Sequence, residues 1–192
     1  MELRDAIRGR RSVRRFRPDP VPKEVIEDIL EAATWAPSAM NRQDWYFVVV
    51  TGSRLKELLE VFAGAFAAIE PVLQERFKDK PKVVEATRKF FHGMGGAPAV
   101  ILAYAGKLPT GGDDVCSTAL AVQNLMLSAY EHGLGATWTD GVLAGAAQIN
   151  ELVGMSDKKL VCAIPVGYPD EVPVAPGRRP DKVLWLGFSE GA

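Results

Sequence analysis

The stretch Asp113–His132, DDVCSTALAVQNLMLSAYEH, decides the fold because it predicts the longest helix of the chain. Apolar side chains occupy nearly every side of this helix, which is typical of a helix inside a protein core. The two aspartates suit the positive N-terminal end of a helix dipole, and Gly133 suits a left-handed position after the last turn. The sequence therefore predicts a domain built around one central helix.

Shorter segments on both sides of this helix predict a mixed architecture. Strands are expected at Trp45–Thr51, which should be buried on both faces, at Ala99–Ala105 and at Gly135–Thr139. A further buried strand is expected at Leu160–Gly167, where Pro165 indicates an edge or an irregular place. Helical periodicity covers Lys23–Ala36, two or three helices between Arg54 and His92, and a short helix near Ala146–Leu152. Because the order of elements is mixed, we expect an α+β fold rather than a regular βαβ series.

The composition is that of a water-soluble globular protein and excludes several classes. The chain has 192 residues, a formal net charge of −1 and 47% apolar residues, so we expect one domain over residues 1–192. Two cysteines and two histidines exclude a disulfide scaffold and argue against a zinc site. No apolar run approaches the ~20 residues that span a bilayer, and no secretory signal follows Met1. We therefore expect a cytoplasmic protein.

The near-neutral net charge conceals a basic N-terminus. Residues 1–17 contain seven arginines and two acidic residues, which gives a local net charge of +5 and leaves −6 for the rest of the chain. Such a segment can be a solvated face, bind nucleic acid or bind a phosphate-bearing ligand. Nucleic-acid binding is disfavoured, because no aromatic interleaving and no known reader motif accompany the charges.

Other catalytic motifs are weak. No Gly-x-Ser-x-Gly elbow supports a nucleophilic triad, and the pair Asp113 and Asp114 fits a helix cap better than a metal site. The run Gly93-Met94-Gly95-Gly96 precedes a strand instead of following one, so it is a poor match to a dinucleotide-binding loop.

A series of short motifs resembles the nitroreductase family of FMN-dependent flavoproteins, which also includes enzymes similar to iodotyrosine deiodinase. The series begins with Arg10-Arg11-Ser12-Val13-Arg14 and the turn Ala36-Pro37-Ser38 before the first strand. It continues through Gly133–Trp138, Pro165–Pro169 and Arg178-Arg179-Pro180. Each motif alone is common, but their order covers nearly the whole chain. The resemblance implies a nitroreductase-like fold, with a central and mostly antiparallel sheet flanked by helices.

The resemblance also implies where FMN would bind. Arg10, Ser12 and Arg178 match the phosphate-binding positions, with Arg11 between them, and arginine holds phosphate in a bidentate fork. Arg14 is the cation expected near flavin N1, where reduction places negative charge. The resemblance implies that one loop would reach the flavin of a neighbouring subunit, namely Pro37, Ser38, Ala39, Met40 and Asn41. A second segment would run along the flavin's other side, namely Trp138, Thr139 and Asp140. No side chain is expected to be catalytic and no metal is expected, because flavin N5 would carry the chemistry.

The activity implied is hydride transfer from NADH or NADPH, through FMN, to an electron-poor acceptor such as a nitroaromatic or a quinone, in a ping-pong sequence. A homodimer with FMN at its interface is implied too. A reductive dehalogenase, an ene-reductase-like enzyme and a non-catalytic anion or nucleic-acid binder are the alternatives. Many relatives carry proline where this chain has Asp44, which would alter the stiffness of the loop. Residues 62–94 carry no motif, and the family often uses this region to shape the substrate entrance.

Overall fold

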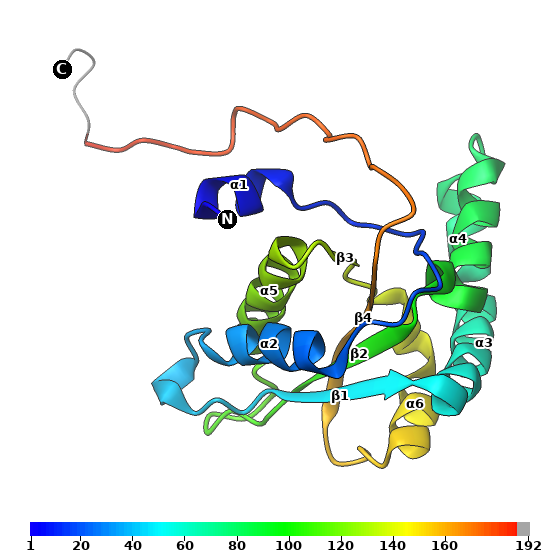
Figure 1. The fold of residues 1–192 in the computed structure, drawn as a ribbon, viewed down its shortest axis with the longest axis horizontal. Helices are drawn as coiled ribbons and strands as arrows, with labels where there is room; N and C mark the ends of the chain where they lie inside the picture. Colours follow the sequence, from blue (N-terminus) through cyan, green and yellow to red (C-terminus); the bar gives the residue numbers. More distant parts are fainter. Residues whose placement is uncertain (188–192) are drawn as a thin grey trace.

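The computed structural model describes residues 1–187, and its centre is a four-stranded sheet in which every neighbouring pair is antiparallel. The strand order is β1-β2-β4-β3 (Figure 1). The strands span Tyr46–Thr51 (β1), Ala99–Ala105 (β2), Gly135–Ala136 (β3) and Lys159–Gly167 (β4). The predicted α+β fold with an antiparallel sheet is therefore confirmed.

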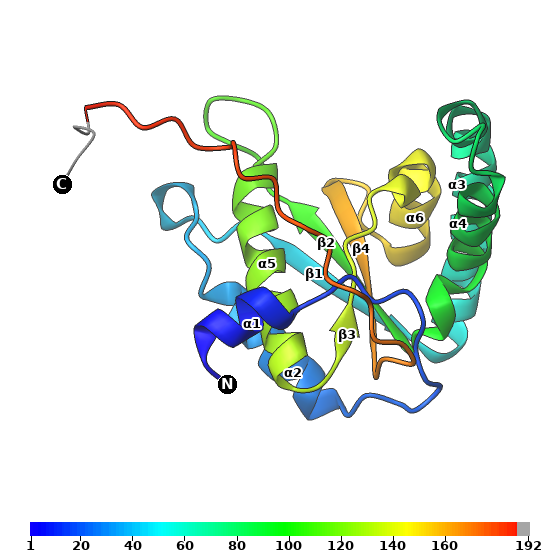
Figure 2. The same ribbon diagram turned by 90° about the horizontal axis from the view of Figure 1, so that it is seen from above.

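Helices cover both faces of the sheet. The α-helices span Leu3–Gly9 (α1), Lys23–Thr34 (α2), Gly52–Arg76 (α3), Pro81–Gly93 (α4), Val115–Glu131 (α5) and Ala146–Val153 (α6). Three 3₁₀ turns complete the elements, at Ala39–Asn41 (η1), Met94–Gly96 (η2) and Gly141–Gly145 (η3). Figure 2 shows α1, α2 and α5 on one side of the sheet and α3, α4 and α6 on the other.

Strand β2 divides the core into two apolar clusters. All seven of its residues are buried, and because side chains alternate between faces, Ile101 and Ala103 pack toward α2 and α5. Leu102 and Tyr104 pack on the opposite face, with apolar residues of α3, α4 and α6. The two sides of the molecule therefore pack against one shared strand.

The long helix α5 begins and ends as its sequence predicts. Asp114 caps its first turn, with Oδ1 accepting a hydrogen bond of 3.0 Å from the backbone N–H of Ser117. Gly133 follows the helix with a φ of +72°, the left-handed conformation expected of it. Two details differ. The helix is not the longest of the described residues, because α3 has 25 residues and α5 has 17. Leu120 is 49% exposed, so α5 is not covered on every side within this chain.

Two sequence predictions about strands need correction. Strand β1 is not buried on both faces, since Tyr46 is 47% exposed and Val49 is 39% exposed. The reason is that β1 lies at the edge of the sheet, and since Tyr46 and Val49 point to opposite faces, both faces are partly exposed there. Pro165 does not mark a sheet edge, because β4 lies between β2 and β3. The other alternative, an irregular place, is present. The pairing of β3 with β4 ends at Ala136 and Val166 and resumes at Thr139 and Ala163, so Pro165 lies at a gap in the ladder that accommodates its missing N–H.

The remaining segments differ in how much of them is packed. Helix α3 continues through Pro71, and the exposed position of this residue accommodates the ring. Residues 170–187 form no helix or strand and run along the outside of the molecule (Figure 1). No helix within residues 1–187 combines the length and the apolar character that a membrane crossing needs.

Candidate functional site

The arginine-rich motif is held as an extended segment along the end of the sheet. The backbone N–H of Val13 donates to Ala136 of β3 at 3.2 Å, and Ser12 forms a parallel bridge with the same residue. Further along, Phe16 donates to the Gly95 carbonyl of η2 at 2.8 Å. Val13 and Phe16 are buried together with Ala97, whereas Ser12 is half-buried and Arg14 is exposed.

Arg10 is a half-buried cation that forms no ion pair with any residue of 1–187. Its Nε atom is buried and makes no hydrogen bond. Burial lowers the pKa of the Arg10 guanidinium, and the positive charges of Arg11 and Arg178 lower it further. A buried donor beside like charges is unfavourable unless an anion binds there. Arg10, Arg11 and Arg178 therefore form a group of three neighbouring cations, which we call the arginine cluster.

The arginine cluster adjoins a cavity of about 310 Å³ lined by Arg10 and Arg11, by Tyr130 and Leu134 at the end of α5, and by Glu171. Arg11 is fixed by the chain itself, since its Nη1 donates to the carbonyls of Arg8 and Arg10 at 2.7 Å each. No residue among 1–187 forms an ion pair with the three arginines of the cluster. A phosphate dianion fits this donor set.

A second group of predicted residues lines a larger cleft. Arg14, Trp138, Thr139 and Asp140 share a cleft of about 1110 Å³ with helix α4, and we call it the α4 cleft. The Oγ1 atom of Thr139 is buried there without a hydrogen-bond partner, while its backbone pairs with Ala163 of β4. The structure thus brings Arg14 together with the segment 138–140, as the resemblance implies.

Glu171 connects the two cavities and was missed by the sequence analysis. Its Oε1 atom accepts a hydrogen bond of 2.6 Å from the backbone N–H of Arg14, and its side chain lines both the smaller cavity and the α4 cleft. Its neighbour Asp170 pairs with Arg15, at 3.4 Å between Nε and Oδ2. The signal was the acidic pair directly after the motif Pro165–Pro169, but the contact joins residues 157 positions apart.

The loop Pro37–Asn41 lies away from both cavities. Figures 1 and 2 place η1 at the end of the molecule opposite α3 and α4. Within one chain the structure therefore does not bring Pro37, Ser38, Ala39, Met40 and Asn41 together with the other predicted residues. The backbone of this region is strained, because Met40, Asn41 and Gln43 each have a φ of +53°. Such strain persists only where surrounding contacts fix it.

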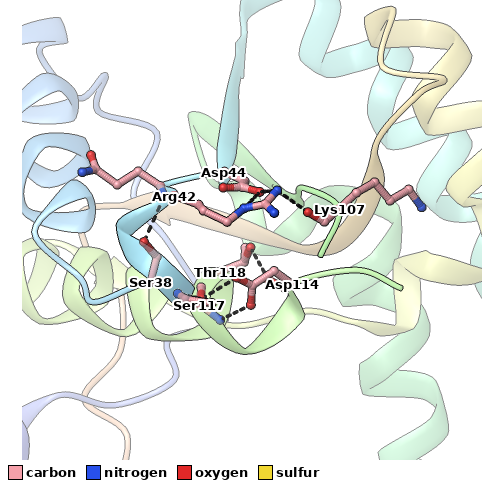
Figure 3. Close-up of polar contacts among 9 residues, drawn as sticks. Ser38, Arg42, Asp44, Lys107, Asp114, Ser117 and Thr118 are labelled. Carbon is pink, nitrogen blue, oxygen red and sulfur yellow. Dashed lines mark hydrogen bonds and ion pairs between the residues drawn. The ribbon is translucent and has the colours of Figure 1, made fainter. Parts of the chain in front are cut away.

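Helix α5 supplies one set of those contacts (Figure 3). The buried Asp114 accepts a hydrogen bond of 2.7 Å from the Ser117 hydroxyl, and Ser117 Oγ accepts one of 3.3 Å from the backbone N–H of Ala39. Ser38 closes the loop on itself, since its Oγ accepts from the Gln43 N–H at 2.9 Å. The cap of the core helix and the loop are thus one hydrogen-bonded unit.

An ion pair fastens the other end of the loop. Arg42 Nε donates to Asp44 Oδ2 at 2.9 Å, and its Nη2 bonds both Asp44 and the Lys107 carbonyl (Figure 3). Hydrogen bonding to Asp44 raises the pKa of Arg42. Asp44 is 15% exposed on its side chain and packs against Gly106, where any Cβ would overlap it. At this position the loop is held by an ion pair and by a hydrogen bond to the Lys107 carbonyl.

We expect Asp44→Asn to loosen this loop without unfolding the protein. The amide keeps the shape but loses the charge that holds Arg42, so the N–H groups of Ala39 and Gln43 should exchange up to about fivefold faster in hydrogen–deuterium exchange. Glu57→Gln is the matched control, because it removes a carboxylate from an exposed pair with Arg54 on α3. Equal exchange in the loop of both variants and the wild type would show that the ion pair does not stiffen it.

Comparison with known proteins assigns the fold. The chain belongs to the nitroreductase family, whose family model matches residues 7–168. It is 34% identical to the candidate NAD(P)H nitroreductase YfhC of Bacillus subtilis over 93% of this chain and 90% of that protein. It is 31% identical to an iodotyrosine deiodinase of Thermotoga neapolitana, covering 88% of this chain and 89% of the relative.

A solved structure agrees with the sequence comparison. The FMN-dependent nitroreductase NfnB of Mycobacterium smegmatis, in complex with NADPH, superposes with a TM-score of 0.73 and 27% identity, over 90% of this chain and 93% of NfnB. The expected family and fold are therefore confirmed, and the chain is an enzyme of the nitroreductase type. These relatives also confirm the expected cofactor class, FMN with NAD(P)H.

Proposed function

We propose that the chain is an oxidoreductase that uses bound FMN to pass hydride from NADH or NADPH, by way of flavin N5, to a nitroaromatic or quinone in two half-reactions. The observation that carries the proposal is Arg10. Its buried, unbonded Nε beside Arg11 and Arg178 is a site prepared for a dianion, and a flavin mononucleotide ends in one.

The residues around the two cavities have separate roles in this proposal. The arginine cluster holds the phosphate, and Ser12, the next residue on the same extended segment, adds a hydroxyl. Arg14 brings a positive charge to the α4 cleft, where it would favour the more negative, reduced state of the ring. The backbone at Trp138, Thr139 and Asp140 offers donors along the same cleft. Binding, orientation and charge are the protein's share of the work.

Exposed apolar surface supports a homodimer. Helices α1, α2 and α5 meet around a groove of about 390 Å³ lined in part by Leu3, Trp35 and Leu127. Trp35 is 77% exposed, and Leu3 and Leu120 are exposed as well, which is more typical of an interface than of a monomer surface. A second copy would cover these residues and could bring its loop Pro37–Asn41 to a cofactor held here. We include in the proposal one FMN-binding domain over residues 1–192 and a cytoplasmic location.

A flavin-dependent reductive dehalogenase is the second candidate, because one relative is named iodotyrosine deiodinase. An ene-reductase-like activity would use the same residues. A non-catalytic anion or nucleic-acid binder remains the candidate from another class. It would leave the strained loop and the α4 cleft without a role, since only the basic N-terminus would be needed.

The test is the absorption spectrum of the purified protein after incubation with FMN, followed by anaerobic addition of NADH and NADPH separately. We expect a yellow protein that is bleached by a nicotinamide and restored by a nitroaromatic or a quinone. Comparing nitrofurazone, a quinone and a halotyrosine as acceptors separates the two enzyme candidates. A protein that stays colourless with excess FMN would refute the proposal, and steeply salt-dependent binding to duplex DNA would favour the third candidate.

A further inference from the structure

The wall of the α4 cleft that carries no family motif is helix α4 itself. Its residues Lys82, Val83, Ala86, Thr87, Lys89 and Phe90 line the cleft opposite Arg14 and Trp138. The region that carries no motif, and that the resemblance links to the substrate entrance, therefore shares this cleft with the residues proposed to approach the flavin. Whatever enters the cleft passes along this helix.

The cleft is large enough for two molecules. At about 1110 Å³ it exceeds the ~300–1,000 Å³ of a typical small-molecule site. Its apolar walls include Phe90, Phe91 and Trp138, which suit flat aromatic rings. An aromatic substrate can thus lie in the cleft in addition to part of a cofactor.

The charges that line the cleft are unbalanced. Arg14, Arg15, Lys82 and Lys89 contribute four positive charges, against Asp140 and Glu171. Arg15 is neutralised by Asp170, whereas the bond between Glu171 and Arg14 uses only the backbone N–H of Arg14. The remaining positive charges of the cleft are those of Arg14 and of the two lysines of helix α4.

The two lysines of α4 are poorly neutralised. Lys82 forms no ion pair with any residue of 1–187, and Lys89 has only Glu85, at a distance of 3.8 Å. Seven positions separate them, which places them on one face of the helix about 10 Å apart along its axis. Arg88, between them in sequence, is turned to another face, where it bonds Glu70 and Glu85. The cleft thus has two cations along one wall and apolar rings behind them.

We propose that Lys82 and Lys89 make the α4 cleft selective for aromatic ligands that carry negative charge. This inference rests on the proposed function. Two substrates of the reaction could supply the charge. One is the donor, since NADPH carries a 2′-phosphate that NADH lacks, and the other is an acceptor that bears a carboxylate. In either case the lysines are specificity-determining residues and take no part in hydride transfer.

The test is the double variant Lys82→Gln/Lys89→Gln, compared with the wild type at low salt. If the donor supplies the charge, kcat/KM for NADPH should fall about 5- to 20-fold and that for NADH should change less than about twofold. If the acceptor supplies it, the same loss should appear for 4-nitrobenzoate and not for 4-nitrobenzyl alcohol. The double variant Lys23→Gln/Lys56→Gln is the control, because it removes the same charge outside the cleft.

A binding measurement separates this inference from the proposed function. If the donor is the charged ligand, calorimetry on the wild type should show that adenosine 2′,5′-bisphosphate binds more tightly than adenosine 5′-monophosphate. If the acceptor is, 4-nitrobenzoate should bind more tightly than 4-nitrobenzyl alcohol. The cleft variant should lose the difference in either case. This readout needs no turnover, so a failure of FMN chemistry does not affect it. Unchanged ratios for donors, acceptors and adenosine phosphates in the cleft variant would overturn the inference.

Discussion

Arg10→Ala is expected to raise the dissociation constant for FMN about 10- to 100-fold, the loss of one bidentate, charge-assisted contact. The physical reason is that Arg10 is the most enclosed member of the arginine cluster and its Nε has no other partner. Titration of the apo-protein with FMN, followed by the quenching of flavin fluorescence, measures the effect.

In the absence of FMN, the same substitution should not destabilise the protein. Burial and two neighbouring cations lower the pKa of Arg10, so the charged side chain opposes folding when no anion is bound. Apo Arg10→Ala should therefore melt at the same temperature as the wild type or higher. Arg4→Ala is the control, because it removes an equal charge from an exposed position in α1. A destabilised apo-protein with unchanged FMN affinity would contradict a phosphate-binding role for Arg10.

Gly95→Ala is expected to lower the melting temperature by about 5–15 °C, which corresponds to about 2–4 kcal/mol of unfolding free energy. Gly95 has a φ of +68°, and a Cβ there would overlap the carbonyl oxygen of Arg14. The obstacle is backbone, so the segment that carries Arg14 and Phe16 must move as a unit. FMN retention should decrease together with stability, since the displaced segment belongs to the proposed site.

Gly64→Ala provides the control with the opposite sign. Gly64 is exposed inside helix α3, and a Cβ there would meet nothing within 4 Å. Alanine should therefore stabilise the protein by about 0.5–1 kcal/mol. Differential scanning calorimetry of the two variants compares them directly, and similar melting temperatures would show that the contact between Gly95 and Arg14 is not close in solution.

The elements with strong local patterns could be predicted from the sequence. The strand expected at Ala99–Ala105 has those bounds in the structure, and the helix expected at Asp113–His132 is α5, Val115–Glu131. Both are continuous apolar segments bounded by turn residues. The strand β1 was also predicted, but its burial on both faces was wrong. Exposure depends on strand order, and strand order is set by contacts between residues far apart in the chain. Local periodicity has no information about which strand lies at an edge.

The residues of the candidate site likewise include some that the sequence could predict and some that it could not. The motif that starts at Arg10 pointed to an anion site, and the structure supports it with a buried, unbonded donor. Glu171 could not be predicted, because its contact with the Arg14 N–H exists only after the chain has turned back on itself. The sequence analysis considered Gly95 only as part of a possible dinucleotide-binding loop. In the structure, the missing side chain of Gly95 lets the N-terminal segment approach closely.

Arg178 differs from Arg10 and Arg11 in the kind of segment to which it belongs. It lies among residues 170–187, which form no helix or strand, and its side chain is exposed. Ordering a loosely packed residue reduces conformational entropy by an amount that offsets part of any contact it makes. The phosphate would thus be held by two arginines whose positions are set by folding and by a third whose position is set by binding. On the proposed function, the occupancy of the cofactor site and the order of residues 170–187 would be thermodynamically linked, and each would stabilise the other.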